Sequence, residues 1–334
     1  MLLAGDVGGT TTRLGWFAVE GGRPVARAVA KYPSRDHAGA AEIVRRFVRE
    51  HPDHAERAAF GVAGPVRAGR VETPNLPWVV TAADLAHALD GAAVDLLNDL
   101  EANTHGIAVL NPDDVHTLAP GAPGAVGNIA VIAAGTGLGE AGAYWDGRRH
   151  HPFACEGGHG DFAPGDALES ELLAHLRARY GAHVSGERVV SGPGLVNLYE
   201  FLRDTGRGTE EPWLRDRLSH GDAAAVIAHA ALQGESPLCV AALAHLARLY
   251  GAEAGNLALK VMATGGVYVG GGIAPRILPF LEGHGFVDGF LAKGRMRPLL
   301  EAIPVRVILN EDTALLGAAR HAASRAGLLD EEDL

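Results

Sequence analysis

Three glycine-rich stretches each follow an apolar run, and glycine loops in that position are typical of phosphate sites. They occupy residues 5–12 (GDVGGTTT), 133–139 (AAGTGLG) and 269–275 (VGGGIAP). Glycines let successive backbone N–H groups turn inward onto an anion. The P-loop pattern needs a lysine after its glycine, and none of the three stretches contains one. We therefore expect amides, hydroxyls and a metal ion to hold a phosphate group here.

The first loop also carries a carboxylate, Asp6. A nucleotide triphosphate binds together with Mg²⁺, and a carboxylate beside the phosphates can hold that ion directly or through its waters. Asp also caps tight turns, which is the alternative role for this residue. The dinucleotide-binding fingerprint is excluded for this loop, because a second strand follows where that fingerprint needs a helix.

Asn98 and Asp99 stand at the end of an apolar strand predicted over 92–99. Open α/β sheets bind their ligands at the carboxyl ends of the strands. In that position Asp99 could accept a proton from a substrate hydroxyl. The other interpretation is a cap for the helical segment that follows, a role that suits both Asn and Asp. From these residues alone, both roles stay open.

Residues 155–161 (CEGGHGD) place two carboxylates and an imidazole between glycines. The HExxH spacing of a metal site is absent from this stretch. Glu156 and His159 therefore predict hydrogen bonds to vicinal hydroxyls of a polyhydroxylated ligand. Glu187, by contrast, is a lone acidic residue near a glycine turn. Its neighbours in the sequence indicate a solvated side chain.

The elements expected to position these residues alternate between strands and helices in the first third of the chain. Runs of apolar and β-branched residues predict strands at 2–4, 13–19, 25–32, 57–66 and 92–99. Helical spacing predicts a helix at 40–50. Thr81 and Asp84 resemble a capping box that opens a helix to Leu89. This order indicates a mostly parallel sheet covered by helices.

The second half repeats the opening pattern of strand, glycine loop and strand at 128–147. Residues 264–277 are interpreted as a strand, a glycine loop and the start of a helix. Helices are predicted at 167–180, 194–204, 222–233 and 237–263. This weak duplication implies two related α/β units, each offering a glycine hairpin, with a soft boundary near residue 108.

The composition excludes several other classes of protein. A formal charge of −11 over 334 residues, without a basic cluster, argues against a nucleic-acid partner. Cys155 and Cys239 alone cannot build a disulfide framework or a four-ligand zinc site, which fits a reducing, cytoplasmic setting. The longest apolar stretch, 238–262, is broken by charged residues and predicts a core helix instead of a membrane span. The N-terminal residues lack the pattern of a signal peptide.

Seven ordered blocks across nearly the whole chain resemble the bacterial glucokinase family, the ATP-dependent hexose kinases of the hexokinase and actin-like ATPase fold. The blocks are GDVGGTTTRLG, GPV with TPNLPW, LLNDLEA, GTGLG, EGGHGDFAP, ERVVSGPGLVNLY and GGVYVGGGIAPR. The resemblance implies a duplicated actin-like, ribonuclease H-like α/β fold with two domains that flank an active-site cleft. Residues 1–108, completed by a helix at about 311–326, would form the small domain, and residues 109–310 the large one.

The resemblance also implies roles for individual residues. In the family, the Asp of the LxND block is the general base, which here is Asp99. The residues that contact the sugar would be Asn98, Asp99, Glu156, His159 and Glu187. The nucleotide-binding residues would be Asp6, Gly8, Gly9, Thr10, Thr11, Gly135, Thr136, Gly137, Gly270, Gly271 and Gly272. The first two loops would face phosphate, the third would lie near adenosine, and Asp6 would bind Mg²⁺ through water.

The implied reaction transfers the γ-phosphoryl group of ATP, with Mg²⁺, to the 6-hydroxyl of glucose, giving glucose 6-phosphate and ADP, the first step of glycolysis. The family further implies a homodimer, and the composition described above predicts a cytoplasmic protein with no membrane or nucleic-acid partner. Some alternatives are also sugar kinases: a hexokinase whose substrate is mannose, fructose or glucosamine, or a kinase whose phosphoryl donor is ADP or polyphosphate. The others are a non-catalytic sugar sensor and an actin-fold ATPase that acts as a chaperone or activator.

Two positions depart from the family pattern. Thr11 stands where many members have Asn, and Glu140 follows GTGLG where a small apolar residue is common. A negative charge on Glu140 beside a triphosphate would weaken nucleotide binding unless the side chain points away.

Overall fold

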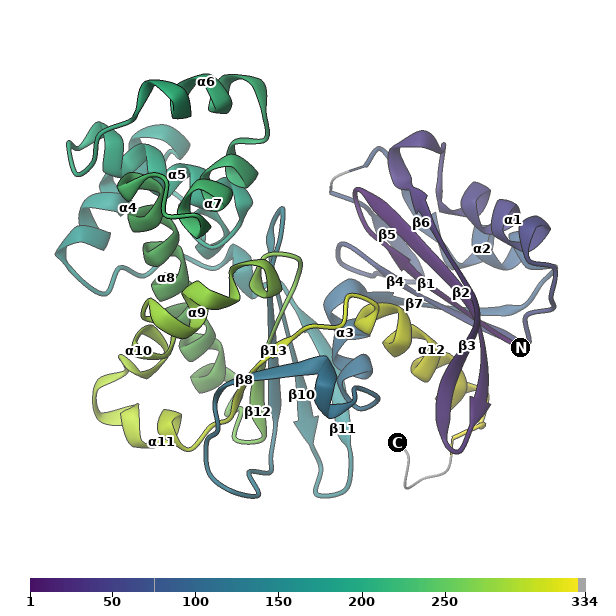
Figure 1. Cartoon of the computed structure of the whole chain (residues 1–334). Coiled ribbons are helices and arrows are strands. Elements are labelled where there is room, and N and C mark those ends of the chain that lie inside the picture. The colour runs from purple at the N-terminus through teal and green to yellow at the C-terminus, as the bar shows by residue number, and fades with distance from the viewer. Residues whose placement is uncertain (75, 330–334) are drawn as a thin grey trace. The chain divides into compact units, whose positions relative to one another are not determined.

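The computed structural model describes residues 1–74 and 76–329, which form two compact units (Figure 1). Among the described residues, the first unit comprises Met1–Asp114, Ala141–Ala154 and residues 310–329. The second comprises Val115–Glu140 and Cys155–Leu309. Each unit is thus assembled from separate segments of the chain.

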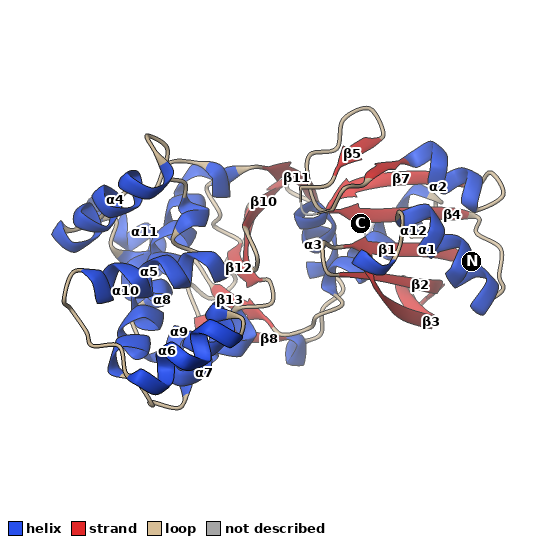
Figure 2. Cartoon of the chain, turned by 90° about the horizontal axis from the view of Figure 1, so that it is seen from above, coloured by secondary structure: helices blue, strands red, loops and turns tan. Residues whose placement is uncertain are grey.

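A five-stranded sheet forms the centre of the first unit, in the order β3-β2-β1-β4-β7 (Figure 2). The strands are β1 (Leu2–Val7), β2 (Thr11–Glu20), β3 (Arg23–Pro33), β4 (Arg57–Val62) and β7 (Ala93–Asn98). The first three are antiparallel neighbours, whereas β1, β4 and β7 run parallel. The register aligns Val7 with Val62 and Val62 with Asn98, so these three strands end at the same edge of the sheet.

Helices cover both faces of this sheet because the strands direct successive side chains to opposite faces. The helices of the unit are α1 (Ala40–Glu50), α2 (Ala82–Ala88), α3 (Asp99–Ile107) and α12 (Thr313–Arg325). Leu3 and Val7 of β1 belong to a buried cluster with α1 and α2. Leu2 and Ala4, which point the other way, pack with α12. The C-terminal helix is therefore part of the first unit's core.

Helix α3, which begins directly after β7, crosses α12 at very short range. A Cβ atom on Gly106 would lie 2.1 Å from the carbonyl oxygen of Thr313. One on Gly317 would lie 1.8 Å from the carbonyl oxygen of Ala102. Because any other residue would add a Cβ at these positions, the crossing requires glycine in both helices. Packing at this crossing holds α3 against α12 and thereby fixes the position of Asp99, the first residue of α3.

The second sheet has six strands in the order β11-β10-β9-β12-β13-β8. The strands are β8 (Val115–Ala119), β9 (Ile129–Ala134), β10 (Leu138–Trp145), β11 (His150–Cys155), β12 (Gly266–Gly270) and β13 (Val305–Ile308). Strands β9, β12 and β13 run parallel, and β8 is antiparallel to β13. Gly270, the last residue of β12, pairs with Ala133 in β9. The second and third glycine loops therefore begin side by side.

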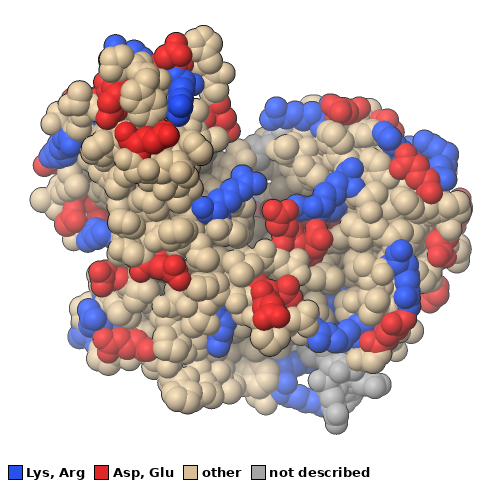
Figure 3. Space-filling view, in the orientation of Figure 1, with Lys and Arg blue, Asp and Glu red and all other residues tan. Residues whose placement is uncertain are grey.

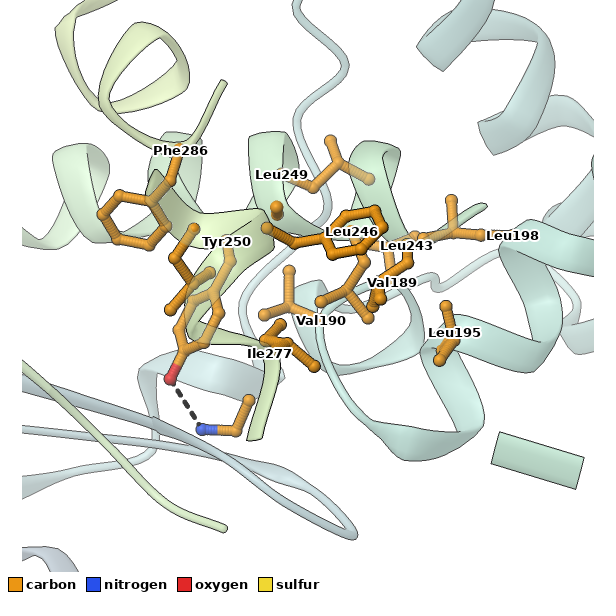
Figure 4. Packing of buried hydrophobic residues seen from close by; sticks show 14 of the residues in the cluster. Val189, Val190, Leu195, Leu198, Leu243, Leu246, Leu249, Tyr250, Ile277 and Phe286 are labelled. Atoms are coloured by element: carbon orange, nitrogen blue, oxygen red, sulfur yellow. Dashed lines mark hydrogen bonds between the residues drawn. The ribbon is translucent and has the colours of Figure 1, made fainter. Parts of the chain in front are cut away.

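The core of the second unit is built around α8, a helix of 25 residues (Figure 4). The helices are α4 (Ala167–Tyr180), α5 (Gly192–Asp204), α6 (Pro212–His220), α7 (Ala223–Leu232), α8 (Pro237–Val261), α9 (Leu278–Gly283), α10 (Phe286–Leu291) and α11 (Arg297–Glu301). Helix α8 contacts α5, α7, α10 and β9, and it buries Leu243, Leu246 and Tyr250. Among the described residues, no single helix has the length and apolar composition of a membrane span.

Most predicted elements are confirmed, with small shifts at their ends, and the helices predicted at 40–50 and 167–180 coincide with α1 and α4. Three expectations need correction. The first sheet is mixed instead of mostly parallel, because β1–β2 and β2–β3 pair antiparallel. Residues after the third glycine loop form a 3-10 turn, Ala274–Ile277, before α9 begins. Thr81 caps α2 as expected, but the capping box is incomplete. In a capping box the carboxylate accepts from the backbone N–H of the cap residue, whereas the Asp84 carboxylate accepts from the Thr81 hydroxyl at 2.7 Å, because Asp is one methylene shorter than Glu.

Several elements were not predicted from the sequence. They are β5 (Arg70–Glu72), β6 (Val79–Thr81), β8, β11, β13, α6, α9, α10 and α11. Most are short, so few residues carry a periodic signal.

Candidate active site

The end of β7 carries Asn98 and Asp99, and the structure shows that Asn98 is the helix cap. Asn98 is the N-cap of α3, and its Oδ1 accepts from the N–H groups of Leu100 (2.9 Å) and Glu101 (3.3 Å). The Glu101 carboxylate accepts from the Asn98 N–H at 3.4 Å, which completes a capping box. Since Asn98 is the cap, Asp99 is the first residue of the helix, and its carboxylate lies at the positive end of the helix dipole.

The first glycine loop joins β1 to β2 and is held by hydrogen bonds at both of its ends. The Gly8 N–H donates to Thr11 O at 3.1 Å. The Ser34 hydroxyl donates to Gly8 O at 2.7 Å, and the Ser34 N–H donates to Thr10 O at 2.9 Å. Ser34 is fully buried and follows β3 directly. It was missed in the sequence, because a serine after a strand has no distinctive pattern, yet it fixes the loop that carries Gly8, Gly9, Thr10 and Thr11.

Asp6 faces its cross-strand neighbour Arg13, whose Nη1 donates to Oδ2 at 3.2 Å. Burial raises the pKa of the Asp6 carboxyl group, the Arg13 charge opposes that rise, and the nearby Asp312 adds to it. Arg13 also reaches Glu311 at 3.3 Å. In the part of the chain that the structure describes, no group of three His, Cys, Asp or Glu side chains could hold a metal ion. Mg²⁺ in proteins is commonly held by one or two carboxylates together with phosphate and water, and Asp6 is the carboxylate of the first glycine loop.

In the second unit, Leu138 joins three of the predicted motifs. It follows the loop of Gly135, Thr136 and Gly137, in which the Gly135 N–H donates to Gly137 O at 2.8 Å. The Leu138 N–H donates to Glu187 Oε2 at 3.1 Å. The prediction of a simply solvated Glu187 is therefore wrong. The contact joins residues 49 positions apart, so no local pattern could reveal it.

Leu138 also contacts the turn that carries Glu156 and His159. A Cβ atom on Gly158 would lie 2.0 Å from the Leu138 carbonyl oxygen. The Gly186 N–H donates to Gly160 O at 2.9 Å, which ties this turn to the one that carries Glu187. Glu156 and His159 are exposed, with 3.9 Å between Oε2 and Nε2. The structure thus brings together the second glycine loop and the two turns predicted to bind a sugar.

The third glycine loop lies directly against the second. Gly271 has φ +79°, and a Cβ atom there would lie 2.4 Å from the Ala134 carbonyl oxygen. The Ile273 N–H donates to Ala134 O at 3.3 Å. Gly270 ends β12, whereas Gly272 has open space around its Cβ position. The loop of Gly270, Gly271 and Gly272 therefore has one glycine that the fold requires and one that it does not.

Glu140, which departs from the family pattern, is buried with 1% of its surface exposed. Its carboxyl group fills the space beside Gly157, where a Cβ atom would lie 1.8 Å from Glu140 Oε2. Burial, with the neighbouring Glu253 carboxylate, raises the pKa of Glu140 to about 7, and Lys260 opposes the rise. The side chain thus points into the protein, beneath the turn that carries Glu156.

The predicted site residues are divided between the two units. Asp6, Gly8–Thr11, Asn98 and Asp99 belong to the first, and the remaining ones belong to the second. The base candidate and the first loop thus lie in one unit, and the other sugar contacts, with both later loops, lie in the other.

Comparison with known proteins gives a consistent result. The family model described as Glucokinase matches residues 3–325. A glucokinase of Nostoc sp. is 41% identical over 97% of this chain and 99% of its own length. The crystal structure of a glucokinase from an Antarctic psychrotroph is 31% identical, with a TM-score of 0.83 over 97% of this chain and 98% of that one.

A more distant structure extends the likeness in fold alone. It is a ROK family glucokinase from Streptomyces griseus, solved in complex with glucose and AMPPNP. It is 23% identical, with a TM-score of 0.66 over 97% of this chain and 99% of that one. The α/β, actin-like ATPase fold predicted from the sequence is thereby confirmed.

Proposed function

This chain belongs to the glucokinase family, and on that basis we propose that it transfers the γ-phosphoryl group of ATP to the 6-hydroxyl of glucose, giving glucose 6-phosphate and ADP. The observation that carries the proposal is the hydrogen bond from the Leu138 N–H to Glu187. A kinase must hold the acceptor sugar beside the donor phosphate. In this chain, a candidate sugar contact is bonded directly to the end of a candidate phosphate loop.

Asp99 is the proposed general base. The transition state of phosphoryl transfer is loose, so positioning and charge stabilisation supply most of the acceleration. Asp99 would orient the 6-hydroxyl and take its proton late in the reaction. Its place at the first position of α3 suits this role, because the helix dipole favours the ionised carboxylate that a base needs.

The remaining hydroxyls of the sugar are assigned to four side chains. The carboxylates of Glu156 and Glu187 accept hydrogen bonds, and His159 can donate or accept them. Asn98 would donate through Nδ2, because its Oδ1 already caps α3. A misplaced hydroxyl leaves one side chain that the bound sugar covers without a hydrogen-bond partner, at a cost of about 1–3 kcal/mol. An epimer of glucose should accordingly react about 10- to 100-fold less efficiently.

ATP is assigned to the three glycine loops. The loops of Gly8–Thr11 and Gly135–Gly137 would hold phosphates through amides and hydroxyls, and Gly270–Gly272 would lie near adenosine. When bound, Mg²⁺ supplies charge neutralisation of the phosphates. Asp6 is the residue proposed to hold the ion through water.

We propose further that the protein acts in the cytoplasm as a homodimer, catalysing the first step of glycolysis, without a membrane or nucleic-acid partner. The net charge of −11 supports the last point, as do the interspersed acidic and basic side chains on the face shown in Figure 3. Residues 1–108 with α12, and residues 109–310, are the proposed functional domains. The boundaries of the compact units near Asp114 and Asn310 agree with that division, whereas Ala141–Ala154, inside the proposed large domain, belongs to the first unit.

The test is the rate of phosphorylation with Mg-ATP across glucose, mannose, fructose and glucosamine, followed by a coupled assay. We expect glucose to react fastest and Asp99→Asn to lower kcat at least about 10²-fold. Asp84→Asn, also in the first turn of a helix in the same unit, is the matched control and should leave kcat unchanged.

Each other outcome identifies an alternative. A variant at Asp99 with activity within a few-fold of wild type would remove Asp99 as the base. Faster turnover of another hexose would make the protein a hexokinase of that specificity. Glucose binding without turnover would favour a sensor, and ATP turnover that sugar does not stimulate would favour an ATPase of the chaperone type. ADP and polyphosphate as donors in the same assay test the choice of ATP.

A further inference from the structure

Tyr250 lies in the middle of α8 and is completely buried beneath the second sheet (Figure 4). Its ring packs edge-to-face against Phe286, with centroids 5.7 Å apart. A phenylalanine could make the same ring contact. The hydroxyl group therefore needs its own explanation, since a buried polar group is costly without partners.

The Tyr250 hydroxyl finds its partners on two strands. It accepts from the Ala134 N–H at 2.9 Å, the bond drawn as a dashed line in Figure 4. It can donate to Gly270 O at 3.1 Å or to Ile132 O at 3.3 Å. Burial raises the pKa of Tyr250, so the hydroxyl keeps the proton that it donates. One side chain thus joins the backbones of β9 and β12.

The place of these contacts along the strands is specific. Ala134 is the last residue of β9, directly before Gly135, and Gly270 is the last residue of β12, directly before Gly271. The pairing of the two strands ends at Ala133 and Gly270. The Ala134 N–H therefore lies beyond the last ladder pair, and the Tyr250 hydroxyl supplies its partner. The hydroxyl bridges the two strands at the point where both glycine loops begin.

We propose that Tyr250 is a positioning residue for the nucleotide: by joining Ala134 to Gly270, it holds the second and third glycine loops in the arrangement that binds ATP. The inference rests on the proposed function of those loops. It goes beyond that function because Tyr250 belongs to no glycine loop and lies in the core of the unit. Loops fixed before binding lose less entropy when the nucleotide arrives, so removing the bridge should weaken nucleotide binding.

The experiment compares Tyr250→Phe with a matched control, Tyr199→Phe. Tyr199 is also fully buried in this unit, and its hydroxyl donates to Glu210 at 2.9 Å, away from the glycine loops. Both changes remove one hydroxyl from a buried ring: Tyr250→Phe loses the bond from Ala134 and the one to Gly270 or Ile132, and Tyr199→Phe loses the bond to Glu210. We measure KM for ATP, KM for glucose, the Kd of AMPPNP by calorimetry, and Tm.

We expect Tyr250→Phe to raise KM for ATP and Kd for AMPPNP by about 5- to 20-fold, because loops that the bridge no longer holds must be ordered when the nucleotide binds. KM for glucose should stay within about twofold, and Tyr199→Phe should leave all three constants within about twofold. If Tyr250→Phe lowers Tm as much as Tyr199→Phe but leaves ATP and AMPPNP binding unchanged, the hydroxyl is only structural and the proposal is overturned.

Two features keep the test decisive. If wild type phosphorylates no hexose, the proposed function fails, while the AMPPNP affinities of wild type and variant still decide the role of Tyr250. If Tyr250→Phe does not fold, hydrogen exchange of the wild-type protein provides the test. In the wild-type protein without nucleotide, the Ala134 amide should exchange its hydrogen as slowly as the preceding amides of β9. Exchange as fast as that of the exposed Thr136 would overturn the proposal.

Discussion

The imidazole rings of His105 and His321 meet edge-to-face where α3 crosses α12, with their centroids 5.0 Å apart. Nδ1 of His321 lies 3.3 Å from Nε2 of His105. Burial lowers the pKa of His105 to about 3, and the charges of His321 and Arg320 contribute. Burial also lowers the pKa of His321, against the attraction of Asp95. The pair therefore stays neutral in the folded protein over a pH range in which an unfolded chain takes up protons.

This pair predicts acid sensitivity of the first unit. As pH falls below about 6.5, the unfolded chain binds a proton at His105 and the folded chain does not. The free energy of unfolding should thus fall between pH 6.5 and pH 4, by on the order of 3 kcal/mol from this residue. His105→Gln should flatten that part of the stability curve measured in urea. The exposed His87→Gln is the control, and an equal effect of both changes would contradict the prediction.

Glu140 predicts the opposite dependence in the second unit. Its pKa of about 7 in the folded protein lies above the ordinary value of 4.5, mainly because of burial. Its contribution to stability is therefore complete below about pH 4.5 and is lost as pH rises through 7. Glu140→Gln replaces the titrating carboxyl with a neutral amide. The difference in the free energy of unfolding, variant minus wild type, should therefore increase by on the order of 2–3 kcal/mol between pH 5 and pH 8.

Urea unfolding at pH 5, 6, 7 and 8 measures this difference. Glu301→Gln, on the surface of the same unit, removes an exposed pair with Arg297 and should give a difference that does not change with pH. A constant difference for Glu140→Gln as well would mean that Glu140 is already ionised in the folded protein at pH 5.

The α/β fold class followed from local patterns in the sequence. Apolar runs and glycine loops located β1, β9 and β12, and helical spacing located α1 and α4, because strand and helix periodicities are encoded by neighbouring residues. Short elements such as β13 escaped, since four residues carry no clear period.

The parts of the site that could not be predicted depend on long-range contacts. Glu187 accepts from a residue 49 positions away, and Ser34 holds a loop 26 positions earlier. Glu140 was recognised as unusual, but its burial beside Gly157 follows from how β10 packs, which no local pattern describes. Tyr250 looks in the sequence like any other apolar position of a core helix. Chemistry that depends on position in space was therefore visible only in the structure.

Two substitutions at Glu187 separate its proposed contact with sugar from its bond to Leu138. Glu187→Gln keeps an oxygen that can accept from the Leu138 N–H but removes the charge. We expect KM for glucose to rise about tenfold with little change in Tm, because a charge-assisted hydrogen bond becomes a neutral one. Glu187→Ala also leaves the Leu138 N–H unpaired, which should lower the free energy of unfolding by about 1–3 kcal/mol.

Steady-state kinetics and urea unfolding of both variants provide the measurement. If KM for glucose is unchanged in Glu187→Gln, then Glu187 acts only as a support for the glycine loop. That result would leave the hydrogen bond to Leu138 as its whole role.

The third glycine loop offers a matched pair of neighbouring residues. Gly271 has φ +79°, and its Cβ position lies 2.4 Å from the Ala134 carbonyl oxygen, whereas nothing lies within 4 Å of the Cβ position of Gly272. An alanine at 271 must both adopt a left-handed backbone conformation and push the loop away from Ala134. We therefore expect Gly271→Ala to raise KM for ATP at least about tenfold, and Gly272→Ala to change it less than about twofold.

Because the third loop belongs to the proposed nucleotide site and not to the sugar site, the Kd of glucose measured without ATP should be the same in both variants and in wild type. An equal loss of glucose affinity in Gly271→Ala would mean that the displaced loop disturbs the whole second unit. An unchanged KM for ATP would mean that the nucleotide does not depend on this loop, and the assignment of Gly270–Gly272 to adenosine would then have to be abandoned.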